Sequence, residues 1–420
     1  MAWIRALREA AMQRLRRLGA RWRLWLAVRW QGARRVPSGH RRWLRRQERQ
    51  WQGSIRQHYS GAPWSIVRLR GALVQPFVDL LNRPSGGEAY FGGVLFEDPQ
   101  RQPVLRHFRG DQPIDRPLTR LEAPQRAVEH CGGRLFWCGP LAFHFGHQIA
   151  DFSSRALLAS VDPRGGELLW LPWRSASTWE ELLPWQRSLL TYLNPGGKRH
   201  RIATEPLQAS ELVVVPQQAR MRAAPSLAHL EALGWCEQAI TPRAGGVVYV
   251  SRTRVAACTS SATLAGAFSA EALLEAFLRE RGVEVVYPET LPLEEQLAIY
   301  LGAEALIVAE GSAQHGLELL GFHPQKPVVV ICRRAQLPGM ELPLLARFPN
   351  AQFVQALQQH WMAKGGVAWN GLALLHWPQV TAVLNPLLPQ PLAAAECAAL
   401  QQAGEDQLRA LAAHVSLHAV

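Results

Sequence analysis

The clearest pattern in the chain lies in residues 283–322, VEVVYPETLPLEEQLAIYLGAEALIVAEGSAQHGLELLGF. Residues 283–287 and 305–309 are short apolar runs, which are typical of buried strands. Each run is followed by a segment with helical spacing, and Gly302 and Gly321 are where the two helices are expected to stop. We therefore predict a strand–helix–strand–helix unit of an α/β domain.

A small-residue turn, Glu310-Gly311-Ser312, joins the second strand to its helix. In an open α/β sheet such a junction lies at the carboxyl ends of the strands, where ligands bind. The start of the following helix offers the amides of Ser312 and Ala313, and about half a positive charge, to an anion. Plain turns share this pattern, so on its own it predicts the place of a site and not its chemistry.

Three stretches make the chemistry more specific: VVYVSR at residues 247–252, YPETLPLEEQ at 287–296 and EGSAQHGLELL at 310–320. They resemble the bacterial branch of the family 61 glycosyltransferases, which carry a strand ending in Ser-Arg, a Pro-Glu before an acidic helix ending in Gln, and a Glu-Gly-Ser turn with a following His. The resemblance covers roughly residues 135–335. Eukaryotic members usually have His-Gly-Ala in place of the Glu-Gly-Ser turn.

The resemblance implies a GT-B-like fold, in which two Rossmann-like α/β domains face a cleft. It implies a hexosyl- or pentosyltransferase of capsular-polysaccharide or other glycan biosynthesis, which moves a sugar from a nucleotide sugar to a glycan or glycolipid acceptor. The second domain would hold the donor and the first the acceptor. No Asp-x-Asp motif with hydrophobic flanks stands out, which fits inverting transfer without a metal. No cofactor besides the donor substrate is expected.

The positive charge is concentrated at the start of the chain. The 420 residues have a formal net charge of +13, and residues 1–60 alone hold 16 Arg and two Glu. The remainder is close to neutral, so it gives no support for nucleic-acid binding. Over residues 1–30 Trp and apolar residues recur at helical spacing among Arg, which predicts a basic amphipathic helix attached to an anionic membrane surface. A helix packed on the protein with a solvated basic face is the alternative.

Composition divides the chain into four predicted parts. These are the basic segment and a linker at residues 1–62, an acceptor-side α/β domain at 63–240, a nucleotide-sugar-binding α/β domain at 241–390, and a C-terminal helix at 391–420. Alternating strands and helices predict mainly parallel sheets covered on both faces. We expect the C-terminal helix to cross back to the first domain.

The apolar runs and the cysteines predict a location. No run is long enough to span a membrane or to form the core of a secretion signal, so we expect a cytoplasmic protein on the inner face of the cell membrane. The six scattered cysteines are expected to be reduced thiols, although Cys131 and Cys138 are close enough to leave a disulfide open.

Inverting transfer needs a base that deprotonates the acceptor hydroxyl. His147 and Asp151 lie four residues apart on a predicted helix, which puts them on one face. A carboxylate beside His147 would orient the imidazole, whose ordinary pKa suits a base. In the rival assignment Asp151 is the base and His147 positions the substrate. A metal site would need a third ligand, and a core histidine without a chemical role is the plain alternative, which we prefer for His144.

The departing diphosphate needs cations or dipoles that take up its charge. Arg252 ends a strand and offers a fork of donors to phosphate oxygens, with Arg254 as an alternate and a surface ion pair as the plain alternative. Glu310 would accept hydrogen bonds from ribose or sugar hydroxyls, orient His315, or cap the following helix. On the resemblance, the donor side comprises Arg252, Glu289, Glu310, Gly311, Ser312, Ala313 and His315.

Two other classes of function stay open. A non-catalytic nucleotide-sugar-binding scaffold of a membrane-associated polysaccharide assembly would keep Arg252 and the Glu310 turn but would not need His147 or Asp151. A nucleic-acid-binding protein with a basic arm would bind through residues 1–60 alone, and the binding would fall steeply with salt.

Overall fold

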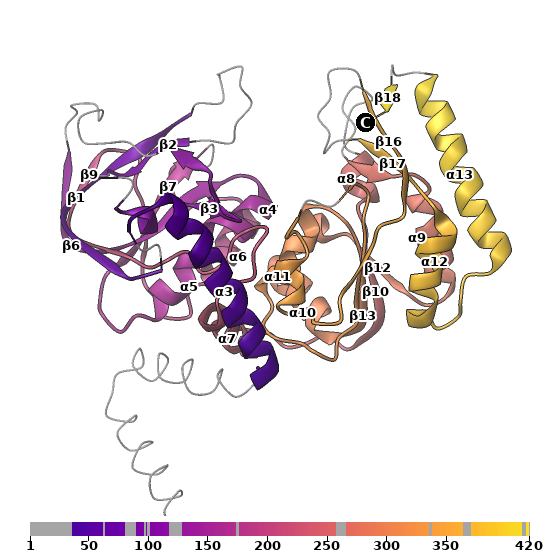
Figure 1. The fold of residues 1–420 in the computed structure, drawn as a ribbon, viewed down its shortest axis with the longest axis horizontal. Helices are drawn as coiled ribbons and strands as arrows, with labels where there is room; N and C mark the ends of the chain where they lie inside the picture. The colour runs from indigo at the N-terminus through magenta and orange to yellow at the C-terminus, as the bar shows by residue number, and fades with distance from the viewer. Residues whose placement is uncertain are drawn as a thin grey trace, which may run out of the picture. The chain divides into compact units, whose positions relative to one another are not determined.

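The structure of the protein is a computed structural model (Figure 1). It describes residues 36–61, 64–79, 90–95, 98, 101–116, 128–173, 176–257, 266–335, 338–363, 371–413 and 417–419. The predicted amphipathic helix over residues 1–30 lies outside these residues. The chain divides into two compact units, Met1–Ala239 (unit 1) and Ile240–Val420 (unit 2). Both contain helices and sheets, so the mixed α/β class is confirmed.

Unit 1 is built on a seven-stranded sheet with the order β5-β2-β1-β9-β6-β7-β8. The β9-β6-β7-β8 part is parallel, as predicted, whereas β1 runs antiparallel to both β2 and β9. The strands are β1 (Val67–Asp79), β2 (Tyr90–Val94), β5 (Asp115–Arg116), β6 (Glu129–Ala142), β7 (Glu167–Trp173), β8 (His200–Ile202) and β9 (Leu207–Val214).

One face of this sheet carries an apolar core. Leu135, Leu212 and Val214 point into it from neighbouring strands because alternate residues of a strand share a face. A hairpin of β3 (Phe108–Arg109) and β4 (Gln112–Pro113) follows a 3-10 helix at Pro103–Leu105, where a strand over Val104–Phe108 is predicted. The helices are α3 (Ser38–His58), α4 (Phe145–His147), a π-helix (Gln148–Phe152), α5 (Ser154–Val161), α6 (Pro184–Tyr192), α7 (Leu227–Cys236) and a 3-10 turn (Glu237–Ala239).

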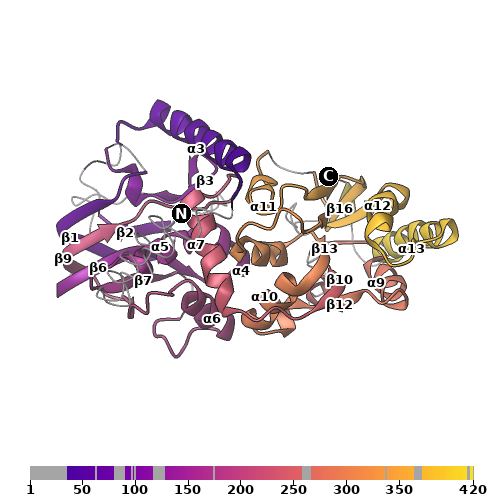
Figure 2. The same cartoon turned by 90° about the horizontal axis from the view of Figure 1, so that it is seen from below.

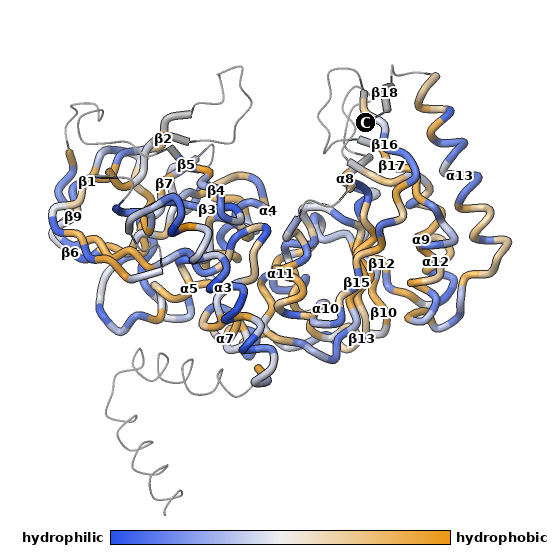
Figure 3. The backbone as a smooth tube through the Cα atoms, in the orientation of Figure 1, coloured by the Kyte–Doolittle hydropathy of each residue, from blue (hydrophilic) through white to orange (hydrophobic). Residues whose placement is uncertain are grey.

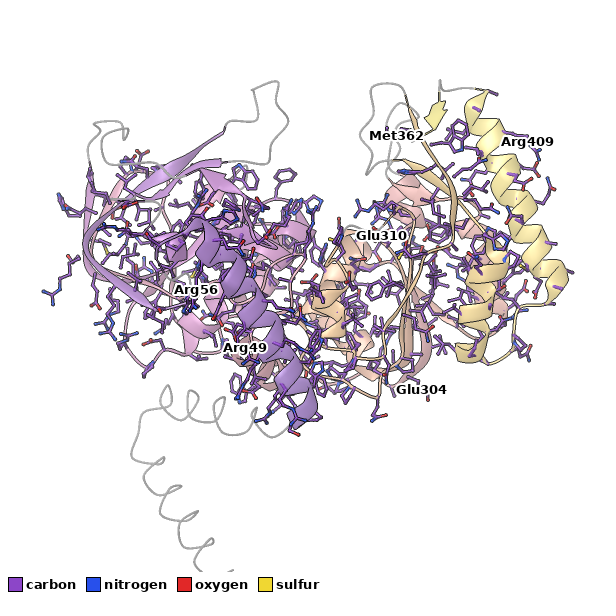
Figure 4. All side chains as sticks on the ribbon, in the orientation of Figure 1. Arg49, Arg56, Glu304, Glu310, Met362 and Arg409 are labelled. Carbon is purple, nitrogen blue, oxygen red and sulfur yellow. The ribbon has the colours of Figure 1, made fainter. Side chains whose placement is uncertain are left out.

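The predicted linker over residues 31–62 is wrong over Ser38–His58, because α3 is a helix of 21 residues there. Its sequence is so rich in Arg and Gln that the few apolar contacts are easily missed, yet Leu44 and Ile55 are buried. Trp51 donates its indole N–H to the Gly110 carbonyl at 2.9 Å and has the guanidinium of Arg220 3.6 Å above its ring. Arg49 and Arg56 lie along the same helix (Figure 4).

Unit 2 contains a five-stranded, wholly parallel sheet with the order β12-β10-β13-β14-β15. Its strands are β10 (Gly245–Val250), β12 (Glu284–Val286), β13 (Ala303–Ala309), β14 (Val328–Ile331) and β15 (Gln352–Val354). These strands are mostly hydrophobic (Figure 3), as expected for a sheet covered on both faces. A second sheet, β11-β17-β16-β18, consists of β11 (Ala267–Phe268), β16 (Leu357–Ala363), β17 (Leu372–Leu375) and β18 (Leu417–Ala419).

Helices cover both faces of the parallel sheet (Figure 2). On one side lie α10 (Leu293–Gly302) and α11 (Leu342–Leu345). On the other lie α9 (Glu271–Glu280), α12 (Trp377–Leu384) and α13 (Ala394–Ala412), whose buried Leu274, Trp377 and Leu400 share a core with Tyr249 and Ile307. The remaining helices are α8 (Thr253–Ala257) and 3-10 helices at Pro288–Thr290, Ser312–Leu319 and Asn385–Leu387.

Three predictions about unit 2 need correction. The C-terminal helix α13 packs on α9, α12 and β17 of its own unit. It does so because Leu400 and Gly404 give it a narrow apolar side that fits against this core. The helix after Glu310 is a 3-10 helix. Residues 254–266 are rich in Ser, Thr and Ala, which predicts a loop, but α8 occupies its start.

Candidate functional site

Four neighbouring strands of unit 2 end in charged residues at one edge of the parallel sheet. Arg252 follows β10, Glu289 follows β12, Glu310 follows β13, and Arg333 and Arg334 follow β14. Because the sheet order is β12-β10-β13-β14, these strand ends lie next to one another. The carboxyl edge of an open parallel sheet is the usual place for a ligand.

Glu310 is the centre of this group, and it is 5 % exposed. Its carboxylate accepts hydrogen bonds from the Arg333 backbone N–H at 2.9 Å and from Arg334 Nε at 2.5 Å. Its carbonyl accepts a third, from Arg333 Nε, at 3.1 Å. Figure 4 labels this residue on the strand end. Its partners are thus the two arginines after β14. The alternatives in which Glu310 caps the following helix or orients His315 do not match these contacts.

Arg252 lies against the backbone of Gly311. A Cβ at Gly311 would come within 1.7 Å of Arg252 Nη1, so only glycine leaves room for the guanidinium. The backbone N–H of Arg252 donates to Glu271 Oε1 at 2.8 Å, and its Nε donates to the Gly266 carbonyl at 3.2 Å. Arg252 is buried, which excludes the surface ion pair considered from the sequence.

The cluster is rich in positive charge for so buried a place. Burial lowers the pKa of Arg333 to about 10, against the opposing attraction of Glu310, and Arg252 and Arg334 lower it further. Burial also lowers the pKa of Arg252, while Glu271, Glu310 and Glu289 raise it. Burying like charges together is costly unless partners compensate them; Glu310 and Glu271 do so in part, and a bound anion would add to this. The chemistry that suits this edge is therefore the binding of a phosphate or diphosphate.

His360 on β16 completes the surroundings of the arginines. The residue is buried, and its Nε2 has no hydrogen-bond partner in the part of the chain that the structure describes. Burial and the charges of Arg333 and Arg334 lower its pKa, so the imidazole stays neutral beside them.

The other predicted donor residues differ in their exposure and in their contacts. Glu289 is exposed and close enough to Arg252 to raise its pKa, and Ser312 and Ala313 are half-buried at the start of the 3-10 helix. His315 is buried, and its Nδ1 lies 2.6 Å from Glu318 within that helix. Arg254, the alternate to Arg252, is exposed and stacks its guanidinium on the Tyr287 ring at 4.0 Å.

The Gln that ends the YPETLPLEEQ stretch has a clear structural task. Gln296 Nε2 donates to the carbonyls of Pro288 at 2.8 Å and Leu291 at 3.0 Å. These two bonds fix the turn that carries Glu289. The stretch therefore shapes the edge of the site through its backbone.

In unit 1 the two predicted catalytic residues are in contact. His147 Nδ1 lies 3.3 Å from Asp151 Oδ2, and both residues also contact Arg109 of the β3–β4 hairpin. Arg109 Nη2 is 2.6 Å from Asp151 Oδ2 and 3.0 Å from His147 Nδ1. Asp151 Oδ1 accepts a hydrogen bond from the Met221 backbone N–H at 3.3 Å. The side chain of Asp151 is fully buried, whereas that of His147 is 23 % exposed.

The local fold around these residues is unusual. Asp151 lies in the π-helix Gln148–Phe152, and such short insertions are frequent at functional sites. His144 caps α4 by accepting the His147 backbone N–H at its Nδ1, but the residue is exposed, so the core position preferred for it is wrong. The buried Gln148 bonds Ser153 at 2.9 Å and fixes the start of the π-helix.

Burial and pairing divide the roles of His147 and Asp151. Burial alone would raise the pKa of Asp151, but hydrogen bonds from His147 and Arg109 outweigh it and hold this pKa below its ordinary value. A buried carboxylate with a lowered pKa is a weak base. The geometry therefore favours Asp151 as the group that orients His147.

Arg109 and Asp151 compete for the tautomer of His147. An arginine only donates, so its 3.0 Å contact is a hydrogen bond when Nδ1 carries no proton. A carboxylate only accepts, so the 3.3 Å contact with Asp151 needs a proton on Nδ1. Base action through Nε2 requires the tautomer that carries its proton on Nδ1, which is the one that the contact with Asp151 needs.

Sequence reasoning missed Arg109, Arg333, Arg334 and His360. The Arg333-Arg334 pair had a signal, because it directly follows the apolar run VVVIC at residues 328–332, which is typical of a buried strand. Arg109 and His360 had no such signal in the sequence. Contacts of the β3–β4 hairpin and of the second sheet bring these two residues to their sites from distant parts of the chain. Cys131 and Cys138 are free thiols, so the disulfide left open does not form. Within the described ranges no group of three His, Cys, Asp or Glu could hold a metal ion.

The chain matches the family model Glycosyltransferase 61 over residues 145–324. The matched segment begins just before His147 and Asp151 in unit 1 and ends in unit 2, after the Glu310 turn. It includes Arg252 but neither Arg109 nor the Arg333-Arg334 pair. The match supports a glycosyltransferase, which has a donor and an acceptor substrate. A comparison with curated proteins found no match.

Proposed function

We propose that this protein is an inverting, metal-independent glycosyltransferase with a nucleotide sugar as its donor. The proposal rests mainly on the group of three arginines around Glu310 and Gly311, because their guanidinium groups suit a diphosphate. In this proposal the protein is a member of the bacterial branch of the family. Its two units form a GT-B-like arrangement. A hexose or pentose is transferred to a glycan or glycolipid in polysaccharide biosynthesis, without a cofactor.

The donor half of the reaction is assigned to unit 2. Arg252, Arg333 and Arg334 would bind the diphosphate, with the amides of Ser312 and Ala313 at the start of the 3-10 helix. The sugar–phosphate C–O bond breaks and leaves a negative charge on the diphosphate, and three arginines supply the positive charge that a metal ion supplies in other enzymes. The residues proposed for the donor side remain Arg252, Glu289, Glu310, Gly311, Ser312, Ala313 and His315, the last as structural support.

The acceptor half is assigned to unit 1. His147 Nε2 would take the proton of the acceptor hydroxyl as its oxygen attacks the anomeric carbon, and Asp151 would hold the imidazole and stabilise the charge it gains. Arg109 keeps Asp151 ionised for this purpose. A positioned general base is worth roughly a 100- to 10,000-fold rate increase.

Attachment to a membrane stays a proposal on the sequence alone. The basic residues at 1–35 lie outside the described residues, and α3 adds more arginine beside them. No helix in the described part is long and apolar enough to cross a membrane. We propose a peripheral, cytoplasmic protein that binds anionic lipid through residues 1–60.

Release of nucleotide tests the function. The protein is incubated with a panel of nucleotide sugars, with and without acceptor extracts, and with a chelator in a parallel series. We expect acceptor-dependent release of nucleoside diphosphate from one donor, unchanged by the chelator. Tight nucleotide-sugar binding without release under any condition would favour the non-catalytic scaffold, and loss of release with chelator would overturn the metal-independent mechanism.

A further inference from the structure

A separate hollow lies on the unit 1 sheet, near the amino-terminal end of β6. It has a volume of about 820 Å³. It is lined by Arg68, Arg70, Gly132, Gly133, Arg134, Gly165, Ser210 and Glu211. His147 follows the opposite end of β6, and the eight residues from Arg134 to Ala142 put roughly 26 Å of strand between the hollow and that end.

The strand register aligns the charges of this hollow. Arg70 of β1 lies opposite Glu211 of β9, which in turn lies opposite Arg134 of β6. Arg68 lies two residues before Arg70 and therefore points to the same face. Leu212, next to Glu211, points to the apolar core on the other face. Three arginines and one glutamate thus share one open sheet surface.

Glu211, the one glutamate of the hollow, forms an ion pair with Arg134. Arg134 Nε and Nη2 lie 2.9 and 2.7 Å from Glu211 Oε2, and Arg134 Nη1 donates to the Gly165 carbonyl at 3.3 Å. The side chains of Arg68 and Arg70 are exposed and form no hydrogen bond or ion pair with another described residue, although Arg68 is close enough to Glu211 to help lower the pKa of that carboxylate. Their two positive charges are therefore available to an anion.

The backbone at this place is shaped around the arginines. The β6–β9 register shifts between Cys131 and Arg134, so Gly132 and Gly133 form a bulge. Bulges re-aim the next side chain, here Arg134. A Cβ at Gly132, Gly133 or Gly165 would meet no atom within 4 Å, so the glycines leave open space above the backbone. A ligand can therefore approach the main chain between the arginines.

We infer that this hollow binds an acidic saccharide, through carboxylate groups that pair with Arg68 and Arg70. The choice of a saccharide rests on the proposed function, in which the acceptor is a glycan. The charge complementarity itself does not depend on that function.

Binding to a uronic-acid oligomer tests the inference without any donor or turnover. The full chain is titrated with an oligogalacturonate in low salt by calorimetry, and a neutral maltooligosaccharide of equal length is the matched ligand. The double variant Arg68→Ala/Arg70→Ala is compared with Arg101→Ala, which removes an exposed arginine of the same unit outside the hollow. Both variants change exposed side chains, and their thermal midpoints check that they fold.

We expect the oligogalacturonate to bind, the double variant to bind it about tenfold more weakly or worse, and Arg101→Ala to bind as the wild type does. Equal affinity for the neutral oligomer, or an unchanged double variant, would overturn the inference. Loss of phosphatidylglycerol-vesicle binding in the double variant, without oligomer binding by the wild type, would replace the saccharide by a lipid surface. Failure of the nucleotide-release assay would refute the proposed function and leave this result intact.

Discussion

The Asp151 carboxylate has no exposed surface, and Arg109, His147 and the Met221 amide all contact it. Its charge is retained in the interior because these partners favour the ionised form more than burial disfavours it. The same contacts that make it a poor base make it a good support for His147. This division of roles follows from burial, which the four-residue spacing in the sequence does not reveal.

The lowered pKa of Asp151 predicts how stability depends on pH. Its ionised form stabilises the fold by an amount that is fully present above the ordinary value near 3.8 and is lost as pH falls through the lower folded-state value. Asp151→Asn removes the charge opposite the half-buried Arg109 and is expected to cost about 3 kcal/mol in urea unfolding at pH 7. The difference from wild type should shrink below pH 3.8. The half-exposed Asp98→Asn is the control, and an equally large loss at pH 3 and pH 7 would contradict this role.

At the scale of elements, the junction between β13 and its 3-10 helix brings the Glu310 carboxylate and the Arg252 guanidinium together. Gly311 has an extended backbone that any residue could adopt, so the requirement for glycine comes from the lack of space beside Arg252. The Glu-Gly-Ser turn is therefore a packing motif for an arginine.

Gly311→Ala should displace the Arg252 guanidinium and weaken nucleoside diphosphate binding about tenfold, the worth of one charge-assisted hydrogen bond. Calorimetry with a nucleoside diphosphate measures this. Gly246→Ala in the same unit is the matched control, because a Cβ there meets no atom within 4 Å. Equal affinities of the two variants would show that the turn does not hold Arg252 for the ligand.

Helix α3 supports the hairpin that carries Arg109. Trp51 packs edge-on against Phe108, the neighbour of Arg109, and bonds Gly110 at 2.9 Å. Ser54 Oγ bonds Asp111 at 2.7 Å in the same hairpin. A helix that the sequence places in a linker thus holds one of the three side chains of the His147 site.

Trp51→Ala should lose this packing and the stacking of Arg220, with a loss of roughly 3 kcal/mol in the free energy of unfolding. It should also lower turnover, because Arg109 would lose its support. Trp43→Ala on the same helix, whose ring stacks on His40, is the control and should cost less. A Trp51→Ala variant as stable and active as the control would separate α3 from the site.

For the whole molecule, the sequence predicts best where contacts are local in the chain. The strands and turns around Arg252 and Glu310 follow from apolar runs and from glycine and proline positions, and the parallel order brings the strand ends together. Arg109 and His360 reach their sites through contacts with distant segments, which periodicity does not show. The antiparallel placement of β1 and the packing of α13 likewise depend on tertiary contacts.

The central claim is a division of labour, in which Arg252 in unit 2 binds the donor and His147 in unit 1 activates the acceptor. The most direct test measures nucleoside diphosphate affinity and turnover together in Arg252→Ala and His147→Ala. Arg252→Ala should weaken binding by roughly 1.5 to 3 kcal/mol. His147→Ala should bind as the wild type does and turn over roughly 100 to 10,000 times more slowly. Wild-type affinity in Arg252→Ala, or full transfer by His147→Ala, would contradict the claim.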